Sequence, residues 1–144
     1  VPTQGVRIGL ANIVILTGII YLSFREAFVL VLLKSFILGL FLGNPLSFII
    51  GLSGSILSFF TMYLLLNVKR NYFSLMGVSV AGGIMHNIGQ IIALIPYYSF
   101  VVVFNLFWLI PFGLGTGLFI GYIVSILRRY LNKGLVFKTI IGKK

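Results

Sequence analysis

Residues 46–66 read "LSFIIGLSGSILSFFTMYLLL", a continuous apolar run without a charged side chain. One helix needs about 20 apolar residues to cross the hydrocarbon core of a bilayer. Similar runs recur along almost the whole chain, in which 60% of the 144 residues are hydrophobic and 8% are charged. Soluble domains carry about 25% charged residues, and membrane β-barrels show short alternating segments. The sequence therefore predicts an all-α, polytopic membrane helix bundle.

Five membrane spans can be drawn from these runs, at residues 6–22, 27–42, 46–66, 73–95 and 106–127. Proline fixes the backbone and lacks an N–H, so we expect Pro96 to stop the fourth span and Pro111 to kink the fifth. Residues 97–105 are expected to form a loop or an interfacial segment. Residues 1–131 then make up the helical bundle, and residues 132–144 form a basic tail.

Charged residues orient these spans. Lysine and arginine concentrate in the short cytoplasmic loops of membrane proteins. One side receives only Arg7, and the other receives Arg25, Lys69, Arg70, Arg128, Arg129, Lys133, Lys138, Lys143 and Lys144. The basic side, with the C-terminus, is therefore predicted to be cytoplasmic in a multi-pass protein of the cell membrane. The net charge of +10 is explained by these flanks, and nucleic-acid binding is not expected.

The N-terminus leads to a further expectation. Five spans with a cytoplasmic C-terminus place the N-terminus outside, and the first residues, "VPTQGVRIG", lack signal-peptide character. We therefore expect a preceding helix that this chain lacks, which gives six spans in the intact protein.

Small residues recur at a spacing of four within the spans. Gly113, Gly117 and Gly121 form one such row, and Gly54 with Ser58 forms another. Rows of this kind let helix backbones approach closely in lipid, where the hydrophobic effect does not drive helices together. They predict a tightly packed bundle.

Polar side chains inside the spans predict a binding site. Lys34 lies near the centre of its span, where a lysine costs about 2.5–3.5 kcal/mol to insert. The only acidic residue, Glu26, lies at the cytoplasmic end, where a carboxylate favours a helix start. His86 and Gln90 share one helix face because they are four residues apart. We predict an outward-opening pocket for a small anionic ligand, built from Asn12, Lys34, His86, Asn87 and Gln90. The alternative is that the amides and the histidine only link helices.

Catalysis has no support in the sequence. One acidic residue, one histidine and no cysteine provide neither paired carboxylates nor an ordinary metal site. We therefore expect no enzyme activity, no metal and no cofactor.

Four stretches resemble a known family: "GVRIGLANIVIL" (residues 5–16), "LSGSILSFFTMYLL" (52–65), "SLMGVSVAGGIMHNIGQ" (74–90) and "GLGTGLFIG" (113–121). They look like the Gx transporter family, which is also catalogued as heptaprenyl diphosphate synthase component I. That family is similar to the substrate-binding S components of energy-coupling factor (ECF) transporters. The resemblance implies a six-helix fold, an outward-facing site, and a transmembrane coupling subunit with two ATPases as partners. Asn12, His86, Asn87 and Gln90 fall in matching motifs.

Three functions remain open. The first is the substrate-binding subunit of an ECF-type importer for a vitamin-like or isoprenoid-precursor ligand. The second is a non-catalytic accessory subunit of heptaprenyl diphosphate synthesis, although the chain lacks the aspartate-rich motifs of prenyl diphosphate synthases. The third is a small secondary carrier, which the absence of an intramembrane acid disfavours.

Overall fold

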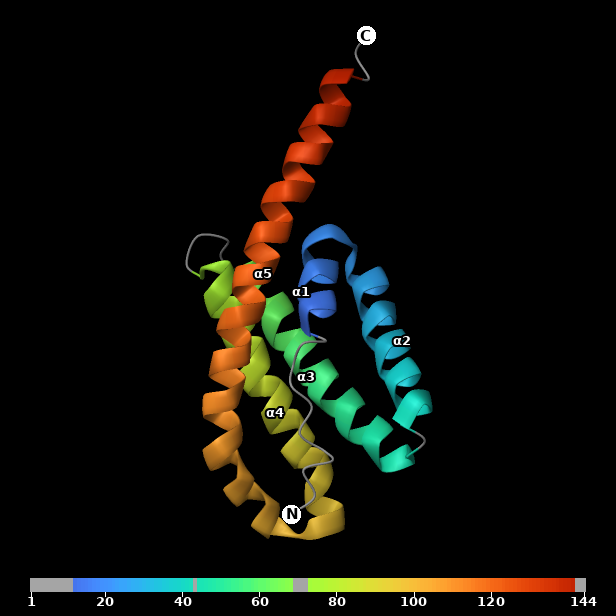
Figure 1. Ribbon diagram of the computed structural model, residues 1–144. Helices are drawn as coiled ribbons and strands as arrows, with labels where there is room; N and C mark the ends of the chain where they lie inside the picture. Colours follow the sequence, from blue (N-terminus) through green and yellow to red (C-terminus); the bar gives the residue numbers. More distant parts are fainter. Residues whose placement is uncertain (1–11, 43, 69–72, 142–144) are drawn as a thin grey trace.

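The computed structural model describes residues 12–42, 44–68 and 73–141, and all of these residues except the short connections at 22–23, 44, 73–74 and 99 are helical. Figure 1 shows the helices in chain order: α1 (Asn12–Tyr21), α2 (Phe24–Leu42), α3 (Pro45–Val68), α4 (Leu75–Tyr98), the 3-10 helix η3 (Phe100–Asn105) and α5 (Leu106–Ile141). These residues contain no strand, so the predicted all-α class is confirmed. Residues 6–11 of the first predicted span, Arg7 included, lie outside the described residues.

Short polar motifs fix the helix starts. Ser23 and Glu26 form a capping box at the start of α2, in which the Ser23 amide donates to Glu26 Oε2 over 3.0 Å and the Glu26 amide donates to Ser23 Oγ over 3.4 Å. The hydrogen bond from the Ser23 backbone is the main cause that lowers the pKa of the Glu26 carboxyl. Asn44 caps α3 by accepting from the Leu46 amide over 3.0 Å. The expected role of Glu26 at a helix start is therefore confirmed.

Three helical stretches in the described residues are long and apolar enough to cross a membrane: Pro45–Asn67, Leu75–Tyr98 and Phe100–Gly134. They correspond to the last three predicted spans. The described part of α1 has 10 residues, and α2 contains Arg25, Glu26 and Lys34 within its 19 residues. Composition and helix length thus agree with a helical membrane protein. Three of the five predicted spans are, in the described residues, long and apolar enough to cross a membrane.

Two boundaries differ from the prediction. Pro96 does not stop α4, which continues to Tyr98 and ends at Ser99 with a φ of 64°. The proline removes only one backbone hydrogen bond in the last turn, so the helix continues. Helix α5 does not end near residue 127 but continues through Pro111 to Ile141. The first ten residues of the predicted tail are therefore helical, and the predicted loop at residues 97–105 contains η3.

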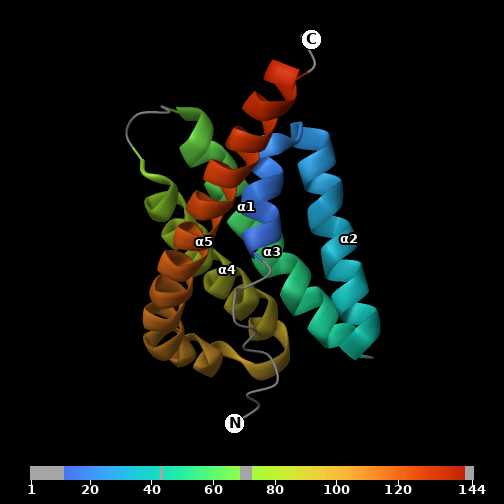
Figure 2. The same cartoon turned by 45° about the horizontal axis from the view of Figure 1, so that its top comes forward.

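The arrangement of the helices defines two ends of the bundle. Helix α4 lies between α3 and α5, and α2 packs mainly against α1 and α3 (Figure 1). The Ser23–Glu26 turn lies at one end of the bundle, here called the Glu26 end. Asn44 and η3 lie at the opposite end, here called the Asn44 end. Helix α5 extends beyond the other helices at the Glu26 end, as the tilted view shows (Figure 2).

Glycines bring the backbones of α3, α4 and α5 together. A Cβ atom added at Gly89 would lie 2.8 Å from the Ser53 carbonyl oxygen of α3, and one at Gly83 would lie 2.7 Å from the Gly113 carbonyl oxygen of α5. A Cβ at Gly117 would lie 2.5 Å from Val80 Cα. No side chain larger than hydrogen fits at these positions without moving a helix backbone. The predicted close packing of small residues is confirmed for these glycines.

Two hydrophobic clusters fill the described interior. The larger cluster lies towards the Glu26 end and joins all five α-helices through residues that include Leu16, Val31, Phe59, Val78 and Ile120. The smaller cluster lies towards the Asn44 end and consists of Ile91, Val102 and Leu109. The polar side chains predicted to bind a ligand lie between these clusters along the helices.

Candidate functional site

His86 and Gln90 form a buried polar pair on the face of α4 that meets α3. Gln90 Nε2 lies 3.0 Å from His86 Nε2. An amide nitrogen only donates, so a neutral His86 accepts this hydrogen bond with Nε2 and carries its own proton on Nδ1. A Cβ added at Gly54 of α3 would lie 2.9 Å from both His86 Nδ1 and Gln90 Cγ. Gly54 therefore makes the space for the pair, and the predicted shared face is confirmed.

Asn87 lies on the face of α4 that meets α5. Its Nδ2 donates to the Leu109 carbonyl oxygen of α5 over 2.6 Å, and a Cβ at Gly113 would lie 2.7 Å from this nitrogen. The side chain is buried. The structure thus brings Asn87 to α5 and away from the face that carries His86 and Gln90. This hydrogen bond links two helices, which is the alternative role that the sequence left open for the amides.

Lys34 reaches α3 beside the His86–Gln90 pair. Its Nζ donates to Ser55 Oγ over 2.9 Å, and the lysine is half-buried on α2. Ser55 follows Gly54, on which His86 and Gln90 pack. Residues 54 and 55 of α3 therefore lie between the cation of α2 and the imidazole of α4. A serine hydroxyl is neutral, so this contact adds no countercharge to the ammonium group.

Asn12 is the first described residue of α1 and is 1% exposed. Neither atom of its amide has a hydrogen-bond partner among the described residues, and the same holds for Ser58 Oγ. Ile15 and Leu16 of α1 pack in the larger hydrophobic cluster with Phe59 of α3. Asn12 lies one helical turn closer to the Asn44 end than Ile15 and Leu16. It is therefore at about the level of residues 55–58 of α3. Burying an amide or a hydroxyl without a hydrogen-bond partner costs free energy, so a polar ligand group that bonded to Asn12 or Ser58 would be stabilised there.

These residues form one band at the middle depth of the bundle, here called the polar layer: Asn12, Lys34, Ser55, Ser58, His86 and Gln90. All except Lys34 are at most 4% exposed. The layer is therefore packed closed in this structure, and a ligand that reaches it must displace side chains that now cover it. Four of the five predicted binding residues belong to the layer, and Asn87 lies outside it.

Ser55 and Ser58 belong to the polar layer but were not among the predicted binding residues, because small residues at this spacing were interpreted as packing residues. A signal for Ser55 was present in the turn between α2 and α3. This turn pairs α2 with α3, so positions about equally distant from it lie opposite each other. Lys34 and Ser55 are such positions.

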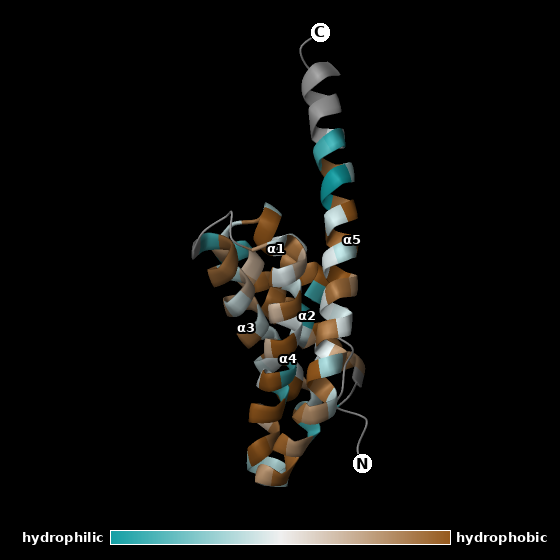
Figure 3. Cartoon of the chain, turned by 90° about the vertical axis from the view of Figure 1, so that its left-hand side faces the viewer, coloured by the Kyte–Doolittle hydropathy of each residue, from teal (hydrophilic) through white to brown (hydrophobic). Residues whose placement is uncertain are grey.

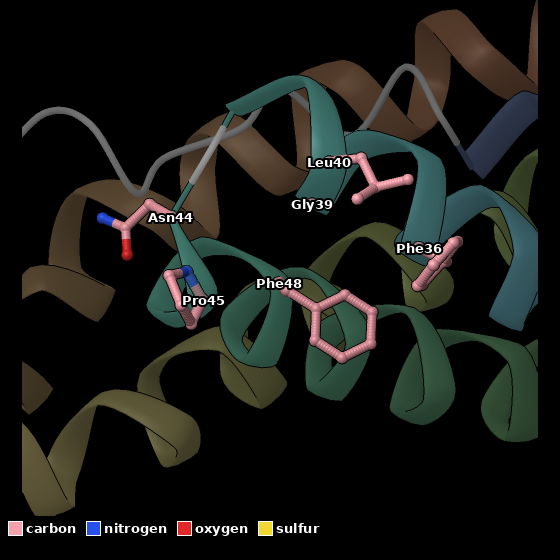
Figure 4. Close-up of a pocket in the computed structure, with 6 residues that line it drawn as sticks. All are labelled: Phe36, Gly39, Leu40, Asn44, Pro45 and Phe48. Atoms are coloured by element: carbon pink, nitrogen blue, oxygen red, sulfur yellow. The ribbon is translucent and has the colours of Figure 1, made fainter.

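A separate pocket of about 390 Å³ lies between α2 and α3 at the Asn44 end (Figure 4). Its lining is mainly apolar and consists of Phe36, Gly39, Leu40, Asn44, Pro45 and Phe48. None of the five predicted binding residues lines this pocket. It suits an apolar chain better than an anion, because Asn44 is its one polar side chain.

The polar layer carries side chains that can bind polar or negatively charged groups. It offers an ammonium group, an imidazole, two amides and two hydroxyls. The one carboxylate of the chain, Glu26, is part of the capping box at the Glu26 end. No group of three or more His, Cys, Asp or Glu side chains able to hold a metal ion occurs within the described ranges. The layer can thus stabilise negative charge and planar hydrogen-bonding groups.

Comparison with known proteins identifies the family. Neither a curated protein nor a solved structure matches the chain. The model of one family, described as heptaprenyl diphosphate synthase component I, matches residues 1–127. The match covers the polar layer and all helices except the end of α5. The chain therefore belongs to the heptaprenyl diphosphate synthase component I family.

Proposed function

We propose that the chain is the substrate-binding membrane subunit of an importer and that it holds a small anionic ligand at the polar layer. The observation that carries this proposal is the placement of Lys34. A lysine at mid-depth is costly in lipid, and here its ammonium donates to a neutral hydroxyl one residue away from the packing site of His86 and Gln90. A carboxylate or phosphate of a ligand would supply negative charge at this point.

The remaining groups of the layer would recognise the rest of the ligand. The Asn12 amide and the Ser58 hydroxyl are buried and have unused hydrogen-bonding atoms. A planar ligand with donors and acceptors along one edge would satisfy them. This combination suits a vitamin-like molecule or a phosphorylated precursor. If the family's resemblance to S components of ECF transporters extends to this chain, its partners are a coupling subunit and ATPases. The distribution of lysine and arginine supports a cytoplasmic C-terminus.

Ligand retention tests the proposal. The intact protein would be purified from its own host and analysed by native mass spectrometry, with Lys34→Met and His86→Ala beside it. We expect a small anionic molecule on the wild type and at least a tenfold loss in both variants. Asn87→Ala is the matched control, because Asn87 bonds to α5, and it should keep the ligand. Equal retention in all four proteins would refute the site.

A second function has one specific observation in its favour. The family description names heptaprenyl diphosphate synthase, and the apolar pocket between α2 and α3 offers about 390 Å³ for a prenyl chain. An accessory subunit of this synthesis would co-purify with a prenyltransferase. An importer subunit would co-purify with ATPases. Identification of the proteins that co-elute from mild detergent separates the two.

A further inference from the structure

The far end of α5 carries a cationic surface that the proposed function does not use. Helix α5 has 36 residues, which corresponds to about 54 Å at 1.5 Å per residue. The hydrocarbon core of a bilayer is only about 30 Å thick. Residues 106–127 are sufficient to cross it, so the helix leaves the hydrocarbon near residue 128. The hydrophilic turns of α5 lie beyond the rest of the bundle (Figure 3).

Cations lie at the height where the hydrocarbon ends. Arg128, Arg129 and Lys133 are all exposed. Arg129 and Lys133 are four residues apart and share one face of the helix, and Arg128 lies beside them. The chain's one carboxylate, Glu26, is bonded to Ser23 in the capping box. The three cations thus form a positive surface at the depth of the lipid headgroups.

Exposed apolar side chains flank these cations on the same turns. Tyr130 is 70% exposed and Leu131 is 41% exposed. Tyrosine favours the boundary between hydrocarbon and headgroups, where its ring is in apolar surroundings and its hydroxyl is in water. Cations beside exposed aromatic and apolar side chains, just past the end of a membrane span, are typical of contact with a negatively charged membrane surface.

We propose that residues 128–133 of α5 bind the phosphates of anionic phospholipids at the membrane surface of the Glu26 end. The arginine guanidinium groups donate paired hydrogen bonds to phosphate oxygens, and Lys133 adds a point charge one turn further along. Anionic lipids supply negative charge for these three cations, because the Glu26 carboxylate at this end is bonded to Ser23. These contacts fix the depth of α5 in the bilayer.

The test counts lipids on the full chain. The protein would be placed in nanodiscs of phosphatidylcholine with a minor share of phosphatidylglycerol and analysed by native mass spectrometry. We expect phosphatidylglycerol to be enriched on the wild type. The affinity of the protein for this lipid should fall about fivefold for each cation removed. The variant R128Q/R129Q/K133Q should retain the two lipids in the ratio of the nanodisc. Enrichment should also fall at high salt, which screens exposed charges.

Arg25→Gln is the control, because Arg25 is an exposed cation at the same end but lies outside the proposed surface. It should retain the wild-type enrichment. Wild-type enrichment in R128Q/R129Q/K133Q, or no enrichment on the wild type, would overturn the proposal. The variants lie outside the packed interior, so loss of folding does not complicate the result, and circular dichroism checks this point.

Discussion

Helices α3, α4 and α5 differ from the α1–α2 hairpin in how they are held. In the first region, glycines place backbone against backbone, as at Gly83 with Gly113 and at Gly117 with Val80. In the hairpin, a Cβ at Gly18 would lie 3.0 Å from Leu30 Cδ2, the flexible end of a side chain. Gly39 of α2, near the Asn44 end, packs more tightly, since a Cβ there would lie 2.8 Å from Phe48 Cβ of α3. The end of a side chain can rotate away, whereas a helix backbone cannot. The first region is therefore the more rigid, and movement that opens the polar layer is expected in the hairpin.

Lys34 lies where the hairpin meets the rigid region. Helix α2 packs mainly against α1 and α3, and the hydrogen bond from Lys34 to Ser55 crosses the interface with α3. A ligand anion that replaced the Ser55 hydroxyl would change the contact between the hairpin and the rigid region. Binding and opening of the layer would then be coupled at one side chain.

The largest expected effect is that of Gly117→Ala. The added methyl group would lie 2.5 Å from Val80 Cα, so α4 and α5 must separate, at a cost of about 1–3 kcal/mol. Thermal unfolding in detergent, followed by circular dichroism, should show a lower midpoint. Gly115→Ala is the control, because no atom lies within 4 Å of its added Cβ. If both variants unfold alike, close backbone contact is not what stabilises this region.

Asn87→Ala should have the next largest effect. It removes the hydrogen bond to the Leu109 carbonyl oxygen, and such bonds between membrane helices contribute about 0.6 kcal/mol, and at most about 1.7. Amide hydrogen exchange should become faster in the first turns of α5 and remain unchanged in α2. Asn105→Ala, at an exposed asparagine, should leave exchange unchanged. Faster exchange in α2 would argue against a separate rigid region.

Ser55→Ala should have an effect of similar size that is confined to the hairpin. Loss of the Ser55 hydroxyl removes the hydrogen bond that it accepts from Lys34 between α2 and α3, again worth about 0.6 kcal/mol. We expect faster hydrogen exchange in α2, with α4 and α5 unaffected. Ser53→Ala, a half-buried serine on the same helix, serves as the control. An effect spread over all helices would show that the hairpin and the rigid region respond as one unit.

Gly18→Ala should have the smallest effect on stability. The methyl group meets only the flexible end of Leu30, and alanine favours the helix over glycine by about 1 kcal/mol. The unfolding midpoint should stay the same or rise slightly. A loss as large as that of Gly117→Ala would remove the contrast between the two regions.

Much of the fold could be predicted from local features. Apolar runs indicated the positions of the helices, and Glu26 marked the start of α2. The ends were harder to predict. Pro96 appeared to be a stop, but a proline in the last turn costs only one hydrogen bond. The continuation of α5 past residue 127 was missed because hydropathy reports where the lipid ends, whereas a helix continues as long as its backbone hydrogen bonds are made.

The candidate site could be predicted only in part. The sequence identified the costly polar residues within the spans, and four of the five lie in the polar layer. Whether neighbouring positions on a helix face the same partner depends on how the helices cross. His86 and Asn87 are adjacent in sequence, yet one faces α3 and the other faces α5.

The sequence by itself determined that this chain is an all-α helical membrane protein, because hydrophobicity and helix periodicity are properties of the residues alone. It also determined that this chain offers no pair of acidic side chains, since it has a single acidic residue. Only the tertiary structure decided that Lys34 meets Ser55, that Asn87 links α4 to α5, and that the polar layer is closed. These features depend on the approach of helices distant in sequence, which the glycine contacts and the packing of side chains determine together.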